Sequence, residues 1–280
     1  MNETAGNNEK ETESIEINLL LEGIYQKYGY DFRNYSKAHL KRRILGRMSR
    51  SGLSSVSAMQ HKILYEPDFF HQLLVDLSLN TTEMFRDPKF FLAIREYAIP
   101  ILKTYPFLKI WHAGCSTGEE VYSMAIILKE TGLLDRCIIY ATDFNQIILD
   151  RAAEAIYPVE HLQNYTENYQ NSGGIASLSD YFAVQYNSAM LDKNLKKNIV
   201  FADHNLVTDG VFGEMNMIVC RNVLIYFNRD LQNKVLNLFY ESLMQGGLLC
   251  IGSKETLMFS DLKNNFLPLH KLNIFKKKYD

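Results

Sequence analysis

From Leu108 onward, short apolar runs alternate with windows of helical periodicity. The runs have the length of β-strands, and in chain order they read LKIWHAG, CIIYATD, NIVFADH, MIVCRNVLIYF, GLLCIGS and LNIFKKK. Alternation of this kind is typical of a parallel sheet with crossover helices on both faces. We therefore predict an α/β fold with a doubly wound sheet over residues 107–280.

The part of the chain before this sheet is predicted to be helical. Over residues 17–78, apolar side chains recur at helical spacing and no strand-like alternation interrupts them. Residues 1–16 are acidic and polar and contain almost nothing to bury, which predicts a disordered tail. Residues 79–106 would form a linker that starts with a polar turn and continues into a docking helix.

One segment interrupts the α/β pattern. Residues 158–197 contain a turn signal at Asn171-Ser172-Gly173-Gly174 and a tyrosine-rich strand candidate at Tyr181–Tyr186. We predict that this segment is a small antiparallel β insertion between two elements of the core.

Composition argues against several classes of protein. With 280 residues, 47% of them hydrophobic, the chain can bury a sizeable core without disulfide bonds. Its net charge of −2 argues against extensive contact with nucleic acid. The four cysteines form no CxxC pair and no zinc-ligand pattern with histidine, so we expect reduced core residues and no metal site. Without a signal peptide or an apolar run near the roughly 20 residues of a membrane span, a cytoplasmic protein is expected.

A glycine-bearing turn follows the first apolar run. The sequence Ala113-Gly114-Cys115-Ser116-Thr117-Gly118-Glu119-Glu120 stands between Leu108–His112 and the helix-like Val121–Glu130. Glycine lets the backbone approach a ligand closely, and the start of a helix presents unpaired N–H groups. A strand, a turn and a helix in this order predict a small-molecule site.

The residues around this turn favour S-adenosylmethionine over a dinucleotide. Three residues separate Gly114 from Gly118, unlike the closely spaced glycines of the GxGxxG motif that cradles pyrophosphate. Glu119 and Glu120 would repel phosphate but would suit a ligand that carries an ammonium or sulfonium. Asp143 ends the second apolar run, where a carboxylate accepts hydrogen bonds from ribose hydroxyls, although it could instead cap the following helix.

Two polar residues stand inside the otherwise apolar run Met217–Phe227. Arg221 and Asn222 would be strongly destabilising if they were buried without partners. A strand end at the ligand site explains them, because ligands of doubly wound sheets bind beyond the carboxyl ends of the strands.

Two motifs, AGCSTGEE at residues 113–120 and CRNVLIYF at residues 220–227, resemble the chemotaxis receptor glutamate methyltransferases, the CheR family. The similarity extends over nearly the whole chain from Glu22 and includes RRILGRM and, at residues 80–86, NTTEMFR. It implies a Rossmann-like class I methyltransferase sheet with an all-helical N-terminal domain.

The chain departs from the family pattern at two places. Val121 stands where the family usually has proline, and Gly252-Ser253-Lys254-Glu255 replaces an adjacent Ser-Glu pair. Proline at a helix start is replaceable, so the first departure matters little. We expect the second to change the end of its strand but not the pocket.

The resemblance implies transfer of a methyl group from S-adenosylmethionine to glutamate side chains on the cytoplasmic domain of a chemoreceptor, with S-adenosylhomocysteine as product. By position, the residues implied at the cofactor are Asn80, Thr82, Arg86, Gly114, Glu120, Asp143, Asn205, Leu206, Arg221 and Asn222. Within this set, Glu120 would lie at the methionine portion and Asp143 at the ribose. Asn205 and Leu206 would flank the adenine.

Arg86 and Tyr226 are the implied catalytic residues. A glutamate carboxylate is already ionised at pH 7, so its alkylation needs placement and not a general base. The planar guanidinium of Arg86 can hold one carboxylate oxygen, and Tyr226 can donate a second hydrogen bond from the opposite wall. Two other interpretations stay open: Arg86 could pair with Asp87 or Glu83, and Tyr226 could be a core aromatic.

The helix predicted after residue 37 carries a basic face. Arg43, Arg47 and Arg50 share one side at spacings of i, i+4 and i+7, and Leu40 and Ile44 would face the core. Such a face can simply be solvated. Because the resemblance implies a glutamate-rich receptor helix as substrate, we predict that this face docks the chemoreceptor. Whether the β insertion also holds a receptor peptide stays open.

Other functional classes fit the sequence less well. A nucleic-acid methyltransferase would be expected to carry a Pro-Pro-Tyr type strand end, which Asn222–Ile225 does not supply. A nicotinamide enzyme would need another glycine spacing and a histidine at the hydride. A non-catalytic S-adenosylmethionine-binding module would not need Arg86, Asp143 and Tyr226 together. Methylation of a different protein substrate remains an alternative, and we expect a monomer.

Overall fold

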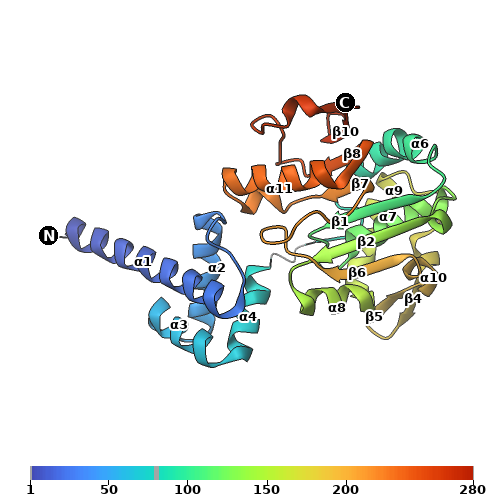
Figure 1. The fold of residues 1–280 in the computed structure, drawn as a ribbon. Coiled ribbons are helices and arrows are strands. Elements are labelled where there is room, and N and C mark those ends of the chain that lie inside the picture. Colours follow the sequence, from blue (N-terminus) through green and yellow to red (C-terminus); the bar gives the residue numbers. More distant parts are fainter. Residues whose placement is uncertain (1, 79–81, 280) are drawn as a thin grey trace. The chain divides into compact units, whose positions relative to one another are not determined.

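The computed structural model describes residues 2–78 and 82–279, with side chains from residue 10 onward (Figure 1). The chain divides into two compact units. The helical unit comprises Met1–Leu79 and Ile225–Gln232, and the sheet unit comprises Asn80–Leu224 and Asn233–Asp280. The sequence predicts a continuous domain over residues 107–280, whereas the chain leaves the sheet unit after Leu224 and re-enters it at Asn233.

The helical unit is built from amphipathic helices, and the predicted all-helical N-terminal domain is confirmed. Its principal helices are α1 (Asn2–Tyr28), α2 (Lys37–Arg50), α3 (Val56–Tyr65) and α4 (Pro67–Leu77). Ser55 caps α3 by accepting a hydrogen bond from the Ala58 N–H, and Pro67 occupies the first turn of α4. The buried apolar side chains of this unit include Leu20, Ile24, Ile44, Met59, Ile63 and Leu73.

Helix α1 begins at Asn2, where the sequence predicts a disordered tail over residues 1–16. Two of the acidic side chains behind that prediction have partners in other helices. Glu13 pairs with Lys41 of α2, and Glu16 accepts hydrogen bonds from the Ser57 N–H (3.2 Å) and hydroxyl (2.5 Å) in α3. Composition cannot reveal such partners, because they lie far along the chain.

Residues 225–232 join the helical unit through backbone and ring contacts. The Ser36 N–H donates to the Tyr226 carbonyl (2.7 Å), and the Asn228 N–H donates to the Asn34 carbonyl (2.9 Å). The rings of Tyr35 and Phe227 meet edge to face with centroids 4.9 Å apart. This segment contains the short helix η5 (Leu224–Tyr226) and the first turn of α11 (Arg229–Ser242).

Within the described residues, seven strands form the main sheet in the order β6-β2-β1-β7-β8-β10-β9. They are β1 (Leu108–Ala113), β2 (Cys137–Asp143), β6 (Ile199–Asp203), β7 (Met215–Cys220), β8 (Leu243–Ile251), β9 (Phe266–His270) and β10 (Ile274–Lys277). The pairs from β6 to β8 are parallel, but β10 is antiparallel to both β8 and β9. The prediction of a parallel sheet is therefore wrong for the last two strands, since apolar runs carry no information on strand direction.

Helices pack on this sheet and enclose its core. Helices α7 (Glu119–Glu130) and α8 (Gln146–Glu154) both contact β2. A continuous helical stretch precedes β1 and consists of α5 (Pro88–Ala93), the π-helical turn η1 (Ile94–Ala98) and α6 (Ile99–Leu102). Short turns η2 (Leu134–Arg136) and η6 (Lys263–Asn265) precede β2 and β9. All four cysteines are buried and free, as expected for core residues.

The predicted β insertion is confirmed as a three-stranded antiparallel sheet in the order β3-β5-β4. Its elements are β3 (Ile156–Pro158), η3 (Val159–His161), α9 (Leu162–Asn171), η4 (Leu178–Tyr181), β4 (Phe182–Gln185), β5 (Ser188–Leu191) and α10 (Lys193–Lys196). Tyr169 and Tyr181 donate hydrogen bonds to Glu130 of α7, which also pairs with Arg95 at 2.5 Å. This buried network attaches the insertion to the sheet unit. No helix in the described part of the chain is long and apolar enough to span a membrane.

Candidate cofactor site at the carboxyl ends of the strands

The turn between β1 and α7 needs glycine at its first position. Gly114 has a φ of +75°, and a Cβ there would lie 2.6 Å from Cγ2 of Val223. The N–H groups of Gly114 and Cys115 both donate to the Thr142 carbonyl at 2.8 Å. The Ser116 N–H donates to the Asp143 carboxylate at 3.1 Å. Three successive N–H groups of the turn are therefore bonded to β2.

Asp143 closes β2 as a buried carboxylate, 8% exposed. Besides Ser116, the Asn145 N–H donates to it at 3.2 Å. Burial raises the pKa of Asp143 to about 6, although the backbone N–H groups act in the opposite direction. Helix α8 is capped by the side chain of Asn145, which accepts from the Ile147 N–H, so Asp143 is not the cap of that helix.

Asn205 and Leu206 lie at the same edge of the sheet as Asp143. Strand β6 pairs with β2 so that Asp203 stands opposite Asp143, and the two residues follow that strand end. The Asn205 side chain accepts from the Val207 N–H at 3.0 Å, which shapes the turn locally. Leu206 is buried.

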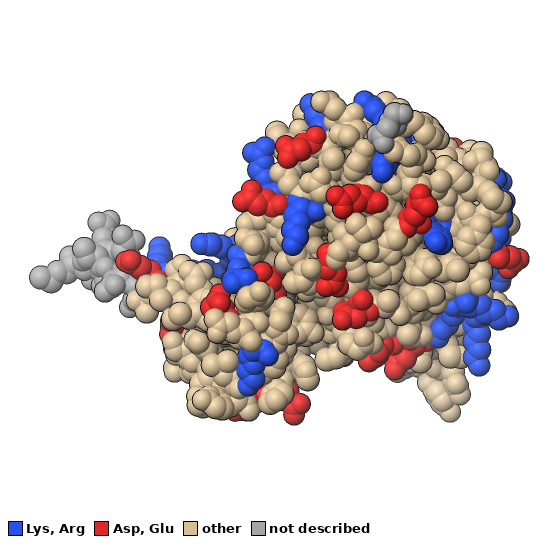
Figure 2. All heavy atoms as spheres, viewed as in Figure 1, with Lys and Arg blue, Asp and Glu red and all other residues tan. Residues whose placement is uncertain are grey.

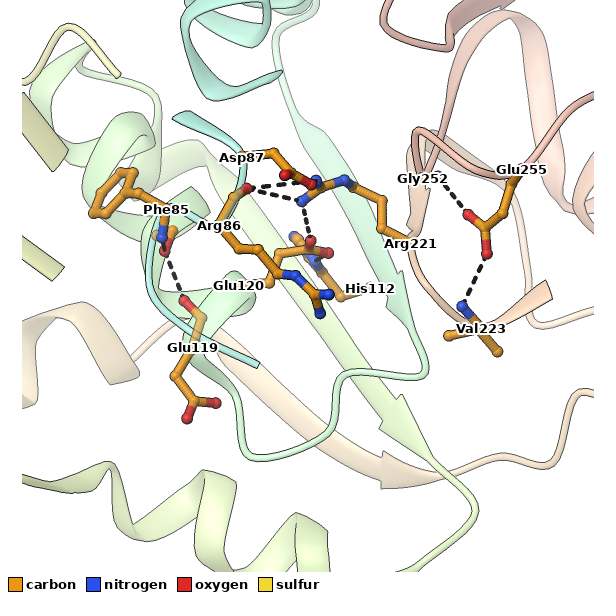
Figure 3. A network of polar contacts seen from close by, with 11 residues as sticks. Phe85, Arg86, Asp87, His112, Glu119, Glu120, Arg221, Val223, Gly252 and Glu255 are labelled. Carbon is orange, nitrogen blue, oxygen red and sulfur yellow. Dashed lines mark hydrogen bonds and ion pairs between the residues drawn. The ribbon is translucent and has the colours of Figure 1, made fainter. Parts of the chain in front are cut away.

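Arg221 follows β7, which ends at Cys220 as predicted, and its side chain is 1% exposed. Its guanidinium pairs with Glu120 at 2.7 Å and with Asp87 at 2.6 Å (Figure 3). It also donates to the Arg86 carbonyl at 3.4 Å and lies 4.0 Å from the ring centroid of Phe90. Arg221 thus joins the linker, the start of α7 and the end of β7, and we call these contacts the Arg221 anchor.

The two adjacent glutamates have different environments. Glu120 pairs with Arg221, and its other oxygen lies 3.3 Å from Nδ1 of His112. Burial alone raises the pKa of Glu120, but the Arg221 charge and His112 outweigh it and lower the pKa. Glu119 accepts from the Thr117 hydroxyl at 2.6 Å, and burial raises its pKa. Arg221 already neutralises Glu120, and the suitability of the two glutamates for a cationic ligand stays a prediction.

The linker turn before α5 is attached to α7 by hydrogen bonds. The Phe85 N–H donates to the Ser123 hydroxyl at 2.8 Å, and that hydroxyl donates to the Glu119 carbonyl at 2.7 Å. Thr82 and Arg86 are half-buried in this segment. Asn80 lies outside the described residues.

The two acidic neighbours considered as partners of Arg86 make other contacts. Asp87 pairs with Arg221, and Glu83 accepts a hydrogen bond from Asn164 at 2.6 Å. Arg86 itself contributes its carbonyl to the Arg221 anchor.

Four residues around this site adopt left-handed backbone conformations although they carry side chains. Their φ angles are 52° at Phe85, 59° at Asp87, 52° at Ser116 and 62° at Asn222. Such conformations persist only where the surroundings enforce them, and they cluster at binding sites. Their concentration in three neighbouring loops supports the prediction of a binding site at this edge of the sheet.

Tyr226 and Arg86 belong to different units. Tyr226 lies in the helical unit, is half-buried and meets the ring of His39 edge to face at 5.1 Å. Arg86 lies in the sheet unit. Their joint action on one substrate therefore stays a prediction.

The basic face of α2 is partly used inside the helical unit. Arg47 pairs with Asp76 of α4 and donates to Gln72, and Arg50 pairs with the same Asp76 carboxylate at 2.7 Å. Arg43 is half-buried. Sequence spacing identifies the shared face but not the acidic partner on the neighbouring helix.

Sequence reasoning missed two residues of this site. His112 contacts Glu120 from inside β1, and a polar residue within a buried strand is the signal that could have identified it. Glu255 accepts from the N–H groups of Val223 (2.9 Å) and Leu224 (2.8 Å). The loop after β8 therefore contacts the turn after β7, and the effect on the pocket of its departure from the family pattern stays a prediction.

The chemistry of this edge fits S-adenosylmethionine better than a phosphate-bearing ligand. The N–H groups of residues 114–116 donate hydrogen bonds to Thr142 and Asp143, so these groups do not form a binding site for a pyrophosphate. The Asp143 carboxylate supplies acceptors, which match the hydroxyl groups of a ribose.

Two family models of known proteins match most of the chain. Residues 80–271 match the family described as CheR methyltransferase, SAM binding domain, and residues 15–78 match CheR methyltransferase, all-alpha domain. The chain is 52% identical over 264 residues to "Putative methyltransferase Cher3" of Pseudomonas putida, covering 94% of this chain and 97% of that protein.

More distant relatives carry chemotaxis names. A chemotaxis protein methyltransferase of Listeria monocytogenes is 27% identical, over 84% of this chain and 87% of that protein. One of Borreliella burgdorferi is also 27% identical, over 86% and 88%. The S-adenosylmethionine-binding domain covers most of the sheet unit and also residues 225–232 of the helical unit, and the chain belongs to the CheR methyltransferase family.

Proposed function

We propose that this protein transfers a methyl group from S-adenosylmethionine to glutamate carboxylates of a chemoreceptor cytoplasmic domain and forms glutamate methyl esters. The observation that carries the proposal is the Arg221 anchor, which holds the Arg86 carbonyl and the Asp87 carboxylate beside the end of β7. Arg86 is thereby attached to the edge of the sheet that carries the proposed cofactor residues. The chemotaxis names of the relatives support the substrate class.

The proposed cofactor contacts come from the strand ends of the sheet unit. S-adenosylmethionine, when bound, supplies a methyl group on a positively charged sulfur. Asp143 would accept hydrogen bonds from the ribose hydroxyls, and Asn205 and Leu206 would flank the adenine. Thr82, Gly114 and Asn222 would line the remaining pocket. Glu120 and Arg221 would act there as a pair, because each already neutralises the other.

The proposed chemistry relies on placement. The acceptor carboxylate is ionised at neutral pH and needs no general base. The Arg86 guanidinium would hold one of its oxygens so that the other is aligned for attack. Tyr226 would donate a second hydrogen bond. Exclusion of water would strengthen the attraction between the carboxylate and the cationic cofactor.

The proposed partner is a chemoreceptor helix rich in glutamate. Arg43, Arg47 and Arg50 would contribute positive charge to the docking surface, although Arg47 and Arg50 share Asp76. We further propose that the protein acts as a cytoplasmic monomer. Two alternatives keep the same fold and cofactor: a non-catalytic S-adenosylmethionine-binding signalling module, and a methyltransferase for a different protein.

Variants at Arg86 test the proposal. Arg86→Ala is expected to lose most methyl transfer to a receptor fragment, because both binding and orientation of the carboxylate depend on the guanidinium. Arg86→Lys should retain charge but lose the forked geometry, and we expect intermediate activity. Transfer is measured with labelled cofactor, and calorimetry with S-adenosylhomocysteine verifies the cofactor site. Near wild-type turnover in Arg86→Ala would contradict the assigned role.

A further inference from the structure

Glu255 is a buried carboxylate whose partners are backbone N–H groups. It follows β8 and is 5% exposed. One oxygen accepts from the N–H groups of Val223 (2.9 Å) and Leu224 (2.8 Å), and the other accepts a short hydrogen bond from the Gly252 N–H (Figure 3). Three N–H groups from two loops thus converge on one side chain.

This arrangement differs from that of Glu120 and resembles that of Asp143, whose carboxylate also accepts from backbone N–H groups. Glu120 has Arg221 as a counter-ion, whereas among the described residues no cation forms an ion pair with Glu255. Burial raises the pKa of Glu255, and the N–H groups act against that rise. A buried carboxylate is destabilising unless its hydrogen bonds are satisfied. Here the backbone of two loops satisfies them.

The loop after β8 is shaped around this carboxylate. A Cβ at Gly252 would lie 2.7 Å from Oε2 of Glu255 and 3.0 Å from the Asn222 nitrogen, so only glycine fits. The Asn273 side chain donates to the carbonyls of Gly252 (2.8 Å) and Glu255 (2.9 Å) and holds the loop from the other side. The carboxylate therefore stands at a fixed place beside the turn after β7.

The turn after β7 has a left-handed conformation at Asn222, with a φ of 62°. Asparagine adopts this conformation more readily than most residues, and the hydrogen bonds to Glu255 hold the next two N–H groups in place. The same turn contains Arg221 and Val223, whose side chain lies where a Cβ on Gly114 would collide. Directly after Leu224 the chain leaves the sheet unit. The Glu255 carboxylate accepts hydrogen bonds from the last two N–H groups before that exit.

We infer that Glu255 is a positioning residue for the cofactor site, which holds residues 222–224 in the conformation that the cofactor requires. Glu255 makes no contact with the cofactor itself and acts through Asn222 and, one residue earlier, through Arg221. The inference rests on the proposed cofactor role of these two residues. It also explains why the carboxylate lies three residues beyond Gly252, since that spacing returns it to the Gly252 N–H.

The main test compares Glu255→Gln with wild type. Glutamine has nearly the same size as glutamate, but its amide NH₂ is a donor and would face the backbone N–H groups. The side chain at position 255 therefore offers fewer hydrogen-bond acceptors to residues 223, 224 and 252. We expect the S-adenosylhomocysteine Kd to rise by about tenfold or more, as for loss of a group that orients ligand contacts. Hydrogen exchange at residues 222–224 and 252 should become faster, while exchange in β1 and β2 stays unchanged. Lys254→Gln, at the exposed neighbouring position, should match wild type in both measurements.

A second variant guards against loss of folding. Glu255→Asp keeps the charge but is one methylene shorter, so it can reach only some of the three N–H groups; we expect a Kd and local exchange rates between those of wild type and Glu255→Gln. Wild-type Kd and wild-type exchange in a folded Glu255→Gln or Glu255→Asp protein would overturn the inference. Faster exchange throughout the sheet unit together with an unchanged Kd would also overturn the inference, because that result is expected for a residue that stabilises the fold and does not affect the cofactor site.

Asn222→Ala separates this inference from the proposed function. If Asn222→Ala weakens S-adenosylhomocysteine binding and Glu255→Gln does not, the cofactor site stands and the positioning role is wrong. If neither Asn222→Ala nor Arg221→Lys changes the Kd, the turn after β7 is not part of the cofactor site, and the proposed function loses that part of its support.

Discussion

The position of Arg221 could be predicted from the sequence, but its contacts could not. A charged residue in an apolar run indicates a strand end at a site, and β7 does end immediately before it. The sequence cannot show, however, that the guanidinium is held by Glu120 and Asp87. Both partners lie about one hundred or more residues earlier, at separations of 101 and 134. Local sequence thus predicts the position of Arg221 but not its contacts.

Arg221→Ala should destabilise the protein. The variant removes the buried partner of Glu120, whose own side chain is 19% exposed, and removal of one partner of a buried pair typically lowers the free energy of unfolding by about 3–5 kcal/mol. Asp87→Asn is the matched control, because the Asp87 side chain is 49% exposed. Its effect should stay within about 1 kcal/mol. Urea unfolding measures both, and equal small effects would contradict a structural anchor.

Cofactor affinity should depend on the ionisation of Asp143. Because its pKa is raised to about 6, the free protein increasingly binds a proton at this group below that pH. Ribose hydroxyls donate to the ionised form, so the S-adenosylhomocysteine Kd should rise as the pH falls through about 6, approaching tenfold per unit. Calorimetry over this range measures the dependence. Asp143→Asn should bind weakly with no such slope; a flat wild-type profile would contradict the role of Asp143.

The same raised pKa affects stability with a definite sign. An acidic group with a raised pKa in the folded state contributes stability at low pH, and this contribution is lost as the pH rises through about 6. Hydrogen bonds from the cofactor to the ionised carboxylate would offset that loss. Stabilisation by S-adenosylhomocysteine should therefore increase with pH across this window, as thermal unfolding can measure.

At the scale of elements, the turn between β1 and α7 has the most stringent geometry. Gly114→Ala should weaken S-adenosylhomocysteine binding by about tenfold or more, because the new Cβ meets Val223 and moves the turn. Gly132→Ala is the control: its φ of +71° is similar, but a Cβ there has open space. Both variants should lose about 1 kcal/mol from left-handed strain. Equal affinities in the two variants would show that the contact with Val223 is unimportant.

Strands were more predictable than their directions. Each apolar run after Leu108 corresponds to a strand of the main sheet, since burial on both faces imposes continuous apolar sequence. The antiparallel pairing of β10 with β8 depends on a hairpin and leaves no such trace. Helix α9 inside the insertion was also missed. Its buried face consists of Tyr165 and Tyr169, and these tyrosines stand among polar residues, so the composition of the segment is typical of a loop.

At the scale of the whole molecule, the chain passes between its two units more than once. Hydrogen bonds between Asn34 and Asn228 join positions 194 residues apart, and no local pattern predicts them. A continuous domain from residue 107 is therefore the natural expectation from sequence. The consequence for function is that Tyr226 belongs to the helical unit, although its motif begins at the end of β7.

Variants in helix α2 should distinguish the contribution of its basic residues to stability from their contribution to docking of the receptor. Arg47→Glu faces Asp76 with a second carboxylate and should destabilise the helical unit by more than about 1 kcal/mol. Arg42→Glu lies at an exposed position and should change stability by less than about 0.5 kcal/mol. If the face formed by Arg43, Arg47 and Arg50 docks the receptor, Arg50→Glu, at a side chain that is 59% exposed, should weaken receptor binding at low salt more than Arg42→Glu, which lies outside that face. Unchanged salt-dependent binding in Arg50→Glu would argue against docking through this face.

The central claim is that the methyl group goes to a receptor glutamate, and the identity of the methylated atom tests it most directly. A chemoreceptor cytoplasmic fragment is incubated with the protein and methyl-labelled S-adenosylmethionine, and the product is mapped by mass spectrometry before and after mild base. The account predicts label on glutamate side chains as a base-labile ester, and its loss in Arg86→Ala. Base-stable label on another residue type, or no label despite normal S-adenosylhomocysteine binding, would contradict it.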